Sequence, residues 1–151
     1  MPRGVLKPGL SWKLPIAAAL AAAGPAFGAE LTVTVAGIRN ADGLVEICLF
    51  NRPDAFPDCG KDSSVLRRRI PAVPGQVRAR FEGLAPGTYA VSVFHDEKRI
   101  GKVETNFLGI PRSGVGASND PQARFGPPSF ASAAFTLPDR AGAITVQMRY
   151  P

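Results

Sequence analysis

The residues whose side chains could catalyse a reaction or bind a metal are concentrated in one stretch at positions 94–120, FHDEKRIGKVETNFLGIPRSGVGASND. The stretch contains the only histidine, His95, followed directly by Asp96 and Glu97. An imidazole beside carboxylates is a residue set used in general acid–base catalysis, and carboxylate and amide oxygens are ligands of calcium. The segment is therefore a candidate catalytic loop, a candidate metal loop, or a long connection between two strands.

A catalytic histidine needs a nucleophile on one side and an orienting acid on the other. Neighbouring residues of a strand point to opposite faces, so Asp96 is badly placed to orient His95. No G-x-S-x-G segment marks a nucleophile elbow. We expect His95 to be a strand-end residue that is hydrogen-bonded to the loop after it, and we assign no catalytic residue. A hydrolase that uses His95 with Asp96 or Glu97 remains the alternative.

A calcium loop of the form D-x-[DN]-x-[DN]-G places side-chain oxygens at alternate positions around the ion. Asp96 stands at the first position of this pattern, Gly101 at the glycine position and Glu104 near a later ligand position. Lys98 and Ile100 occupy the two positions that should supply oxygen. We therefore assign no metal and no cofactor. A further alternative is a domain whose carboxylates bind calcium weakly and which the bound calcium stabilises.

The rest of the segment is rich in glycine, proline and small polar residues, which fix unusual backbone angles. Such a loop is either a structural cover or a recognition surface on a rigid scaffold. We adopt the second interpretation and expect a non-enzymatic binding or structural module that contacts an unidentified protein or ligand of the cell envelope through residues 95–130. The residues expected to contribute to binding are His95, Asp96, Glu97, Glu104, Asn106 and Asn119.

Residues 1–28 have the three-part layout of a secretory signal peptide. A basic front precedes the apolar run LPIAAALAAA at 14–23, and small residues follow. The run is too short to span a bilayer, which takes ~20 apolar residues. We expect cleavage after Gly28, no integral membrane segment after cleavage, and an exported domain at 29–151 that is periplasmic or secreted.

The net charge of +6 falls to +3 when the three cationic residues of the signal peptide are removed. The remaining positive charge is scattered, apart from Arg67, Arg68 and Arg69. Aromatic residues are not interleaved with these arginines, as a stacking platform for bases would require. We therefore expect no nucleic-acid partner.

Cys48 and Cys59 are the only cysteines. Two cysteines in an exported chain predict a disulfide, which here closes the short loop CLFNRPDAFPDC. The spacing is far from the C-x-x-C pattern of redox proteins, so the expected role of the disulfide is structural.

Alternation of apolar and polar residues with a period of two predicts strands along the whole mature chain. In LTVTVAG, Leu31, Val33 and Val35 share one face. In GLVEICLF, Glu46 points away from the apolar face. Six to seven short strands in one domain predict an all-β, antiparallel β-sandwich, because a single open sheet would leave an apolar face in water. The predicted strands lie at 31–37, 43–50, 77–83, 88–96, 132–138 and 143–150, with a weaker candidate at 64–70.

The order and spacing of several segments resemble the bacterial family known as domain of unknown function (DUF) 2141. These segments are FEGLAPGTYAVSVFHDE (81–97), TNFLGIP (105–111), GASND (116–120) and FGPPSF (125–130). The resemblance covers residues 31–150 and implies an exported protein without an established activity. The G-L-x-P-G-T-Y turn is similar to turns in transthyretin-like and carboxypeptidase-regulatory-like sandwiches, which implies an immunoglobulin-like or prealbumin-like fold.

Overall fold

The structure is a computed structural model that describes residues 4, 9, 28–122 and 126–151. Apart from three glycines, the predicted signal peptide at 1–28 lies outside the described residues. Among the described residues, no helix is long and apolar enough to cross a membrane. The elements are β1 (Ala29–Ile38), β2 (Leu44–Phe50), β3 (Leu66–Pro71), β4 (Gly75–Leu84), β5 (Gly87–Asp96), β6 (Val115–Ala117), α1 (Phe130–Ala133), β7 (Phe135–Leu137) and β8 (Ala141–Gln147).

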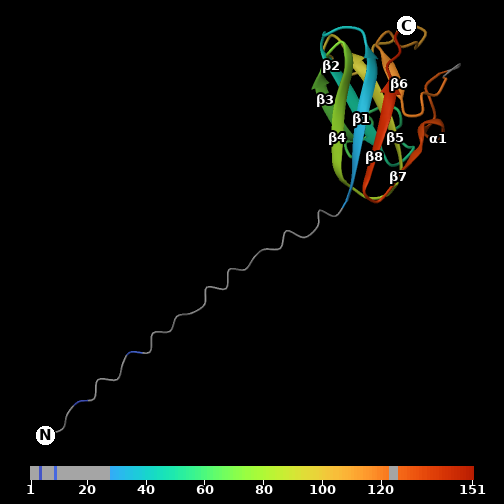
Figure 1. Cartoon of the computed structure of the whole chain (residues 1–151). Helices are drawn as coiled ribbons and strands as arrows, with labels where there is room; N and C mark the ends of the chain where they lie inside the picture. Colours follow the sequence, from blue (N-terminus) through green and yellow to red (C-terminus); the bar gives the residue numbers. More distant parts are fainter. Residues whose placement is uncertain (1–3, 5–8, 10–27, 123–125) are drawn as a thin grey trace.

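The strands form two sheets that pack together (Figure 1). One sheet has the order β4-β1-β8, and the other has the order β3-β2-β5-β6, with β7 paired to β5. The pairings between these strands are antiparallel except for β1 with β8, which is parallel. The predicted all-β sandwich is confirmed, and each of the seven predicted segments contains a strand.

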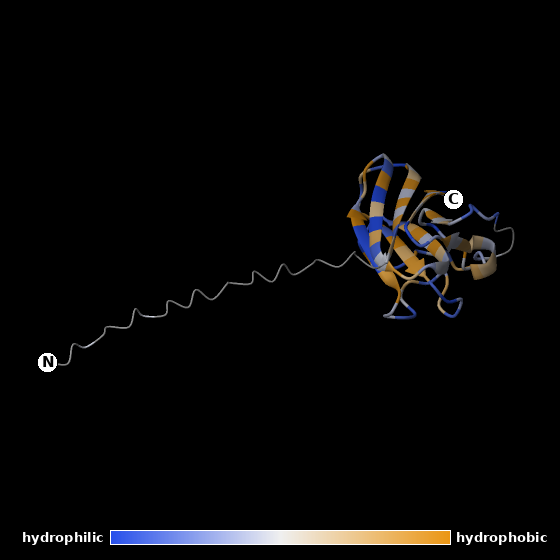
Figure 2. Ribbon diagram, turned by 60° about the horizontal axis from the view of Figure 1, so that its bottom comes forward, coloured by the Kyte–Doolittle hydropathy of each residue, from blue (hydrophilic) through white to orange (hydrophobic). Residues whose placement is uncertain are grey.

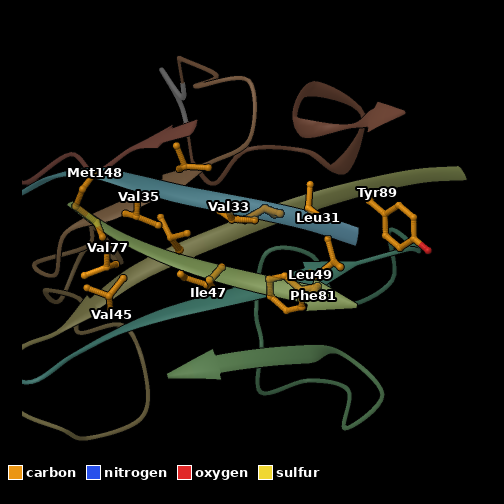
Figure 3. Packing of buried hydrophobic residues seen from close by; sticks show 14 of the residues in the cluster. Leu31, Val33, Val35, Val45, Ile47, Leu49, Val77, Phe81, Tyr89 and Met148 are labelled. Atoms are coloured by element: carbon orange, nitrogen blue, oxygen red, sulfur yellow. The ribbon is translucent and has the colours of Figure 1, made fainter. Parts of the chain in front are cut away.

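The apolar core lies between the two sheets. Leu31, Val33 and Val35 of β1 are fully buried, whereas the threonines between them are partly exposed. Figure 2 shows the same alternation as hydrophobic and hydrophilic bands along the strands. In Figure 3 the β1 side chains lie close to those of β2 and β4, including Ile47 and Phe81. Each fully buried side chain of this size stabilises the fold by about 1.5–3 kcal/mol, so this interface is the main source of stability.

The central strands β2 and β5 of the second sheet are buried on both faces. Every residue of 45–50 and of 89–96 is buried, which explains why these strands are apolar almost without interruption. The segment between β2 and β3 covers the outer face. Its Phe56 ring packs edge-to-face against Phe50 at 5.1 Å and against Phe130 at 5.9 Å between ring centroids.

The predicted disulfide between Cys48 and Cys59 is present. Cys48 lies in the middle of β2, opposite Ser92 of β5. The Ser92 hydroxyl donates a hydrogen bond to the carbonyl oxygen of Pro57 at 3.0 Å. The disulfide and this hydrogen bond together hold the covering segment against the centre of the sheet.

The prediction of one long irregular loop at 95–130 is wrong. β6 lies inside it and pairs with β5, and the Ser118 hydroxyl accepts a hydrogen bond from the Val91 N–H at 2.9 Å. The Asn119 amide donates to the carbonyl oxygens of Ser132 and Ala134. A three-residue strand is too short to show alternation, which is why β6 was missed. The connection between β5 and β6, residues 97–114, is the part that extends beyond the paired strands.

Removing the disulfide should destabilise the domain without unfolding it. The bridge closes a loop with a sequence separation of 11, and loop-closure entropy assigns such a loop about 2–3 kcal/mol of stabilisation. We expect a double substitution, Cys48→Ala with Cys59→Ala, to lower the free energy of unfolding in urea by this amount. Reductant should lower the unfolding midpoint of the wild type and leave the variant unchanged. A variant as stable as the oxidised wild type would contradict the assigned role.

Candidate functional site

His95 lies at the end of β5 and is fully buried. Its Nε2 is 2.6 Å from the carbonyl oxygen of Asp42, and its Nδ1 is 2.7 Å from the hydroxyl of Tyr150. A carbonyl oxygen can only accept a hydrogen bond, so Nε2 carries a proton, and in the neutral imidazole Nδ1 accepts from the tyrosine hydroxyl. Both ring nitrogens are therefore engaged within the protein, and no face of the ring is open to a substrate.

Tyr150 links the C-terminal segment to this end of the sandwich. Its hydroxyl accepts a hydrogen bond from the Arg39 backbone N–H at 3.1 Å, and the Arg39 guanidinium lies 4.4 Å from the centre of its ring. A Cβ atom on Gly114 would overlap the same ring. Burial raises the pKa of Tyr150, which keeps its hydroxyl protonated and able to donate to His95.

The expectation that His95 bonds to the following loop is only partly met. Its backbone N–H donates to the Gly114 carbonyl oxygen at 2.9 Å, which lies in that loop. Its ring instead bonds to the turn before β2 and to the C-terminal segment. These partners are distant in sequence, so alternation along β5 could not reveal them.

Asp96 closes the turn that follows β5. Its two carboxylate oxygens accept hydrogen bonds from the N–H groups of Ile100 at 2.8 Å and Gly101 at 2.7 Å. The turn requires a positive φ at Arg99 (58°) and at Gly101 (79°). Backbone amides thus occupy the carboxylate oxygens that a calcium loop would direct at the ion.

Glu97 forms an ion pair with Arg39, whose Nε lies 2.7 Å from Glu97 Oε1. The hydrogen bond from Arg39 lowers the pKa of Glu97 and keeps it ionised. The same oxygen is 3.7 Å from Nδ1 of His95. That distance is beyond a hydrogen bond, whereas the Tyr150 hydroxyl lies 2.7 Å from the same nitrogen, so Glu97 does not hold the imidazole as the acid of a triad would.

The other predicted site residues lie elsewhere. Glu104 pairs with Lys98 at 2.9 Å, and the amide oxygen of Asn106 accepts hydrogen bonds from the N–H groups of Leu108 and Ile110. Within the part of the chain described, no group of three or more His, Cys, Asp or Glu residues could hold a metal ion. The predicted set is thus divided among four places: His95 with Glu97, Asp96, Glu104 with Asn106, and Asn119.

Sequence reasoning missed the apolar residues at the end of the 97–114 connection. A bridge between Thr105 and Pro111 forms a short hairpin, which Asn106 braces from inside. At its end Phe107 is 94% exposed, Leu108 68% and Ile110 52%. We call these three side chains the apolar tip. Three apolar residues around a glycine, in a segment without strand alternation, were the signal that could have identified it.

Glu46 is a second feature that the sequence did not reveal. It faces away from the core as expected, but it is buried, with only 1% of its surface exposed. Arg69 and Arg67 of β3 place their Nε atoms 3.1 and 3.3 Å from its two oxygens, and Oε2 makes no hydrogen bond within the described residues. Burial raises the pKa of Glu46 and outweighs the opposing effect of the two arginines.

The fold and these contacts define a disulfide-bonded, all-β sandwich protein whose histidine and nearest carboxylates are used in hydrogen bonds and ion pairs of its own structure. Residues 33–145 match the model of a family described as an uncharacterized protein conserved in bacteria (DUF2141), and the chain belongs to that family. The match confirms the resemblance in the sequence. No curated protein and no solved structure matches the chain.

Replacing Tyr150 by Phe should destabilise the domain by about 1–3 kcal/mol, because the buried Nδ1 of His95 loses its hydrogen bond with the tyrosine hydroxyl. The matched control is Tyr89→Phe. Tyr89 donates to the carbonyl oxygen of Ala85, an exposed residue whose carbonyl can be solvated by water instead. We expect a smaller loss for the control in urea denaturation. Equal losses would contradict the role given to the contact between His95 and Tyr150.

The raised pKa of Glu46 predicts a specific pH dependence of stability. Between pH 4.5, the ordinary pKa of a glutamate, and the raised pKa of Glu46 in the folded state, the folded protein binds a proton that the unfolded chain does not. The stabilisation from this proton is thus complete below pH 4.5 and is lost as the pH rises through the pKa of Glu46 in the folded protein. We expect the free energy of unfolding of the wild type, measured relative to Glu46→Gln, to increase as the pH falls from neutral.

The control for this pH series is Glu82→Gln, which replaces a carboxylate whose side chain is 70% exposed. The difference in the free energy of unfolding between Glu82→Gln and the wild type should vary less with pH than the corresponding difference for Glu46→Gln. If the two differences follow the same pH curve, burial of Glu46 is not the cause of the effect.

Proposed function

We propose that the protein is an exported, non-enzymatic binding module of the bacterial cell envelope, and that it contacts its partner through the 97–114 connection. The observation that carries the proposal is the apolar tip. Phe107, Leu108 and Ile110 are exposed together at the end of a hairpin whose backbone is held by Asn106. Large apolar side chains grouped in water are a feature of interaction sites.

The backbone of the tip is braced before any partner arrives. Asn106 accepts two backbone hydrogen bonds through its side chain, and its own backbone N–H donates to the Ile110 carbonyl oxygen at 2.9 Å. The base of the hairpin is joined again where the Arg112 N–H donates to the Glu104 carbonyl oxygen at 2.7 Å. A braced loop loses little conformational entropy on binding, which favours affinity from a small contact area.

Two further features support an exported module. The pattern of residues 1–28 is that of a secretory signal peptide, and disulfides such as Cys48–Cys59 persist mainly in oxidising compartments.

A non-enzymatic role is supported by the state of His95. A general base must reach the proton that it removes, at about 2.6–3.2 Å or through one water. His95 is fully buried, and both of its ring nitrogens are within hydrogen-bonding distance of protein oxygens. Activity as a hydrolase would require this end of the sandwich to open.

Photo-crosslinking in bacterial cells tests the proposal. A photo-reactive residue at position 107 should form adducts with an envelope component, because this side chain is 94% exposed at the end of the hairpin. The matched control places the same residue at position 66, where Leu66 is 43% exposed on β3. Adducts at 107 that are absent at 66 would support the proposal. The same adducts from both positions, or none from 107, would contradict it.

A further inference from the structure

We infer that the partner of the apolar tip is the surface of an anionic lipid bilayer, into which Phe107, Leu108 and Ile110 insert. This inference rests on the proposed function, since export is what would bring the domain to an envelope membrane. It adds the chemical nature of the partner, which the proposed function leaves open.

The exposed apolar residues are concentrated at one end of the sandwich. Leu44 pairs with both Pro71 and Asp96, so the turn after β3 and the connection after β5 emerge at the same end. Five of the six large hydrophobic side chains that the described chain exposes lie in these two segments, and the sixth is at the opposite end of β3. The five are Val73, Ile100, Phe107, Leu108 and Ile110, and the sixth is Leu66.

Positive charge accompanies the apolar residues. The 97–114 connection carries four cationic and two acidic residues, for a net charge of +2. Both acids are already paired, Glu97 with Arg39 and Glu104 with Lys98. The remaining cationic residues of the connection are exposed and form no ion pair within the described residues: Arg99, Lys102 and Arg112. They would face anionic headgroups.

The spacing of these charges fits the depth of a lipid interface. Arg112 follows Ile110 by two residues, and an extended chain rises about 7 Å over two residues. Apolar faces of interfacial segments sit about 5–10 Å into the boundary between headgroups and acyl chains. The tip can therefore reach the acyl boundary while Arg112 stays at the level of the headgroups.

A bilayer fits this surface better than a protein pocket. A pocket selects a compact anchor of defined shape, enclosed by a polar rim. Here the apolar side chains project from the end of a hairpin and recur on the neighbouring turn at Val73, so they are spread over one end of the molecule. The acyl chains of a bilayer form a fluid apolar layer beneath negatively charged headgroups. This layer can accommodate apolar side chains that are spread over one end of the molecule, without a cavity of matching shape.

Binding to vesicles tests the inference directly. The processed, exported protein is sedimented with phosphatidylcholine vesicles that contain about 30% phosphatidylglycerol, and with vesicles of phosphatidylcholine alone. We expect stronger binding to the anionic vesicles and weaker binding in about 0.5 M NaCl, where screening is strong. The double substitution Phe107→Ser with Leu108→Ser should weaken binding by about tenfold or more, because two apolar side chains no longer leave water. Leu66→Ser, the matched control, should bind like the wild type.

A fluorescent probe shows whether the tip itself inserts. The only tryptophan, Trp12, lies in the predicted signal peptide, so Phe107→Trp gives the processed protein a single indole. Its emission should shift to the blue with anionic vesicles and be quenched by brominated acyl chains. Leu66→Trp should show neither effect.

The inference is overturned if the wild type binds neither kind of vesicle, or if Leu66→Ser reduces binding as much as the tip variant does. It is also overturned if the indole at position 107 stays in water while the protein is bound. A protein adduct from position 107 in cells, combined with failure to bind vesicles, would leave the proposed function standing and refute the lipid surface as the partner.

Discussion

The apolar contact between the two sheets is the constraint on which the rest of the molecule depends. β1 and β4 turn one apolar face inward, and β2 and β5 meet them with theirs. Since β2 and β5 also carry apolar side chains such as Phe50 and Phe94 on their outer face, that face needs a cover as well. The disulfide-bonded segment and α1 provide it, with Phe50, Phe56 and Phe130 packed between them and the sheet. The covering loops are therefore a consequence of how the core strands are built.

The same reasoning explains the residues that look catalytic. A sandwich leaves open ends, where strand backbones and core side chains would meet water. At one end the fully buried His95 ring joins the turn before β2 to the C-terminal Tyr150, and Asp96 closes the first turn of the 97–114 connection. Buried polar groups must be hydrogen-bonded, so these side chains are used to close the end. That closed end is a firm base for a hairpin whose apolar residues point into water.

Much of the fold could be predicted because its signals are local. Alternation identified β1 to β5, β7 and β8, and the cysteine count identified the bridge between Cys48 and Cys59. The candidate site could not be predicted in the same way. His95, Glu97 and Asn119 were grouped because they lie in the one loop expected at 95–130. The side chains of His95 and Glu97 instead have their partners in distant segments, and that of Asn119 bonds to the segment around α1. Alternation also gave the direction of Glu46 correctly, yet it could not show that this side chain is buried, with Arg67 and Arg69 of β3 beside it.

The amino-acid sequence by itself determined every strand but β6, the face that the longer strands turn to the core, the disulfide and the family. Each of these follows from the order of residue types over short distances. Only the tertiary structure decided that Glu46 is buried between two arginines, that the imidazole is enclosed, and that Phe107 stands in water. Exposure and hydrogen bonding depend on which distant segments fold over a residue. A pattern with a period of two contains no information about that contact.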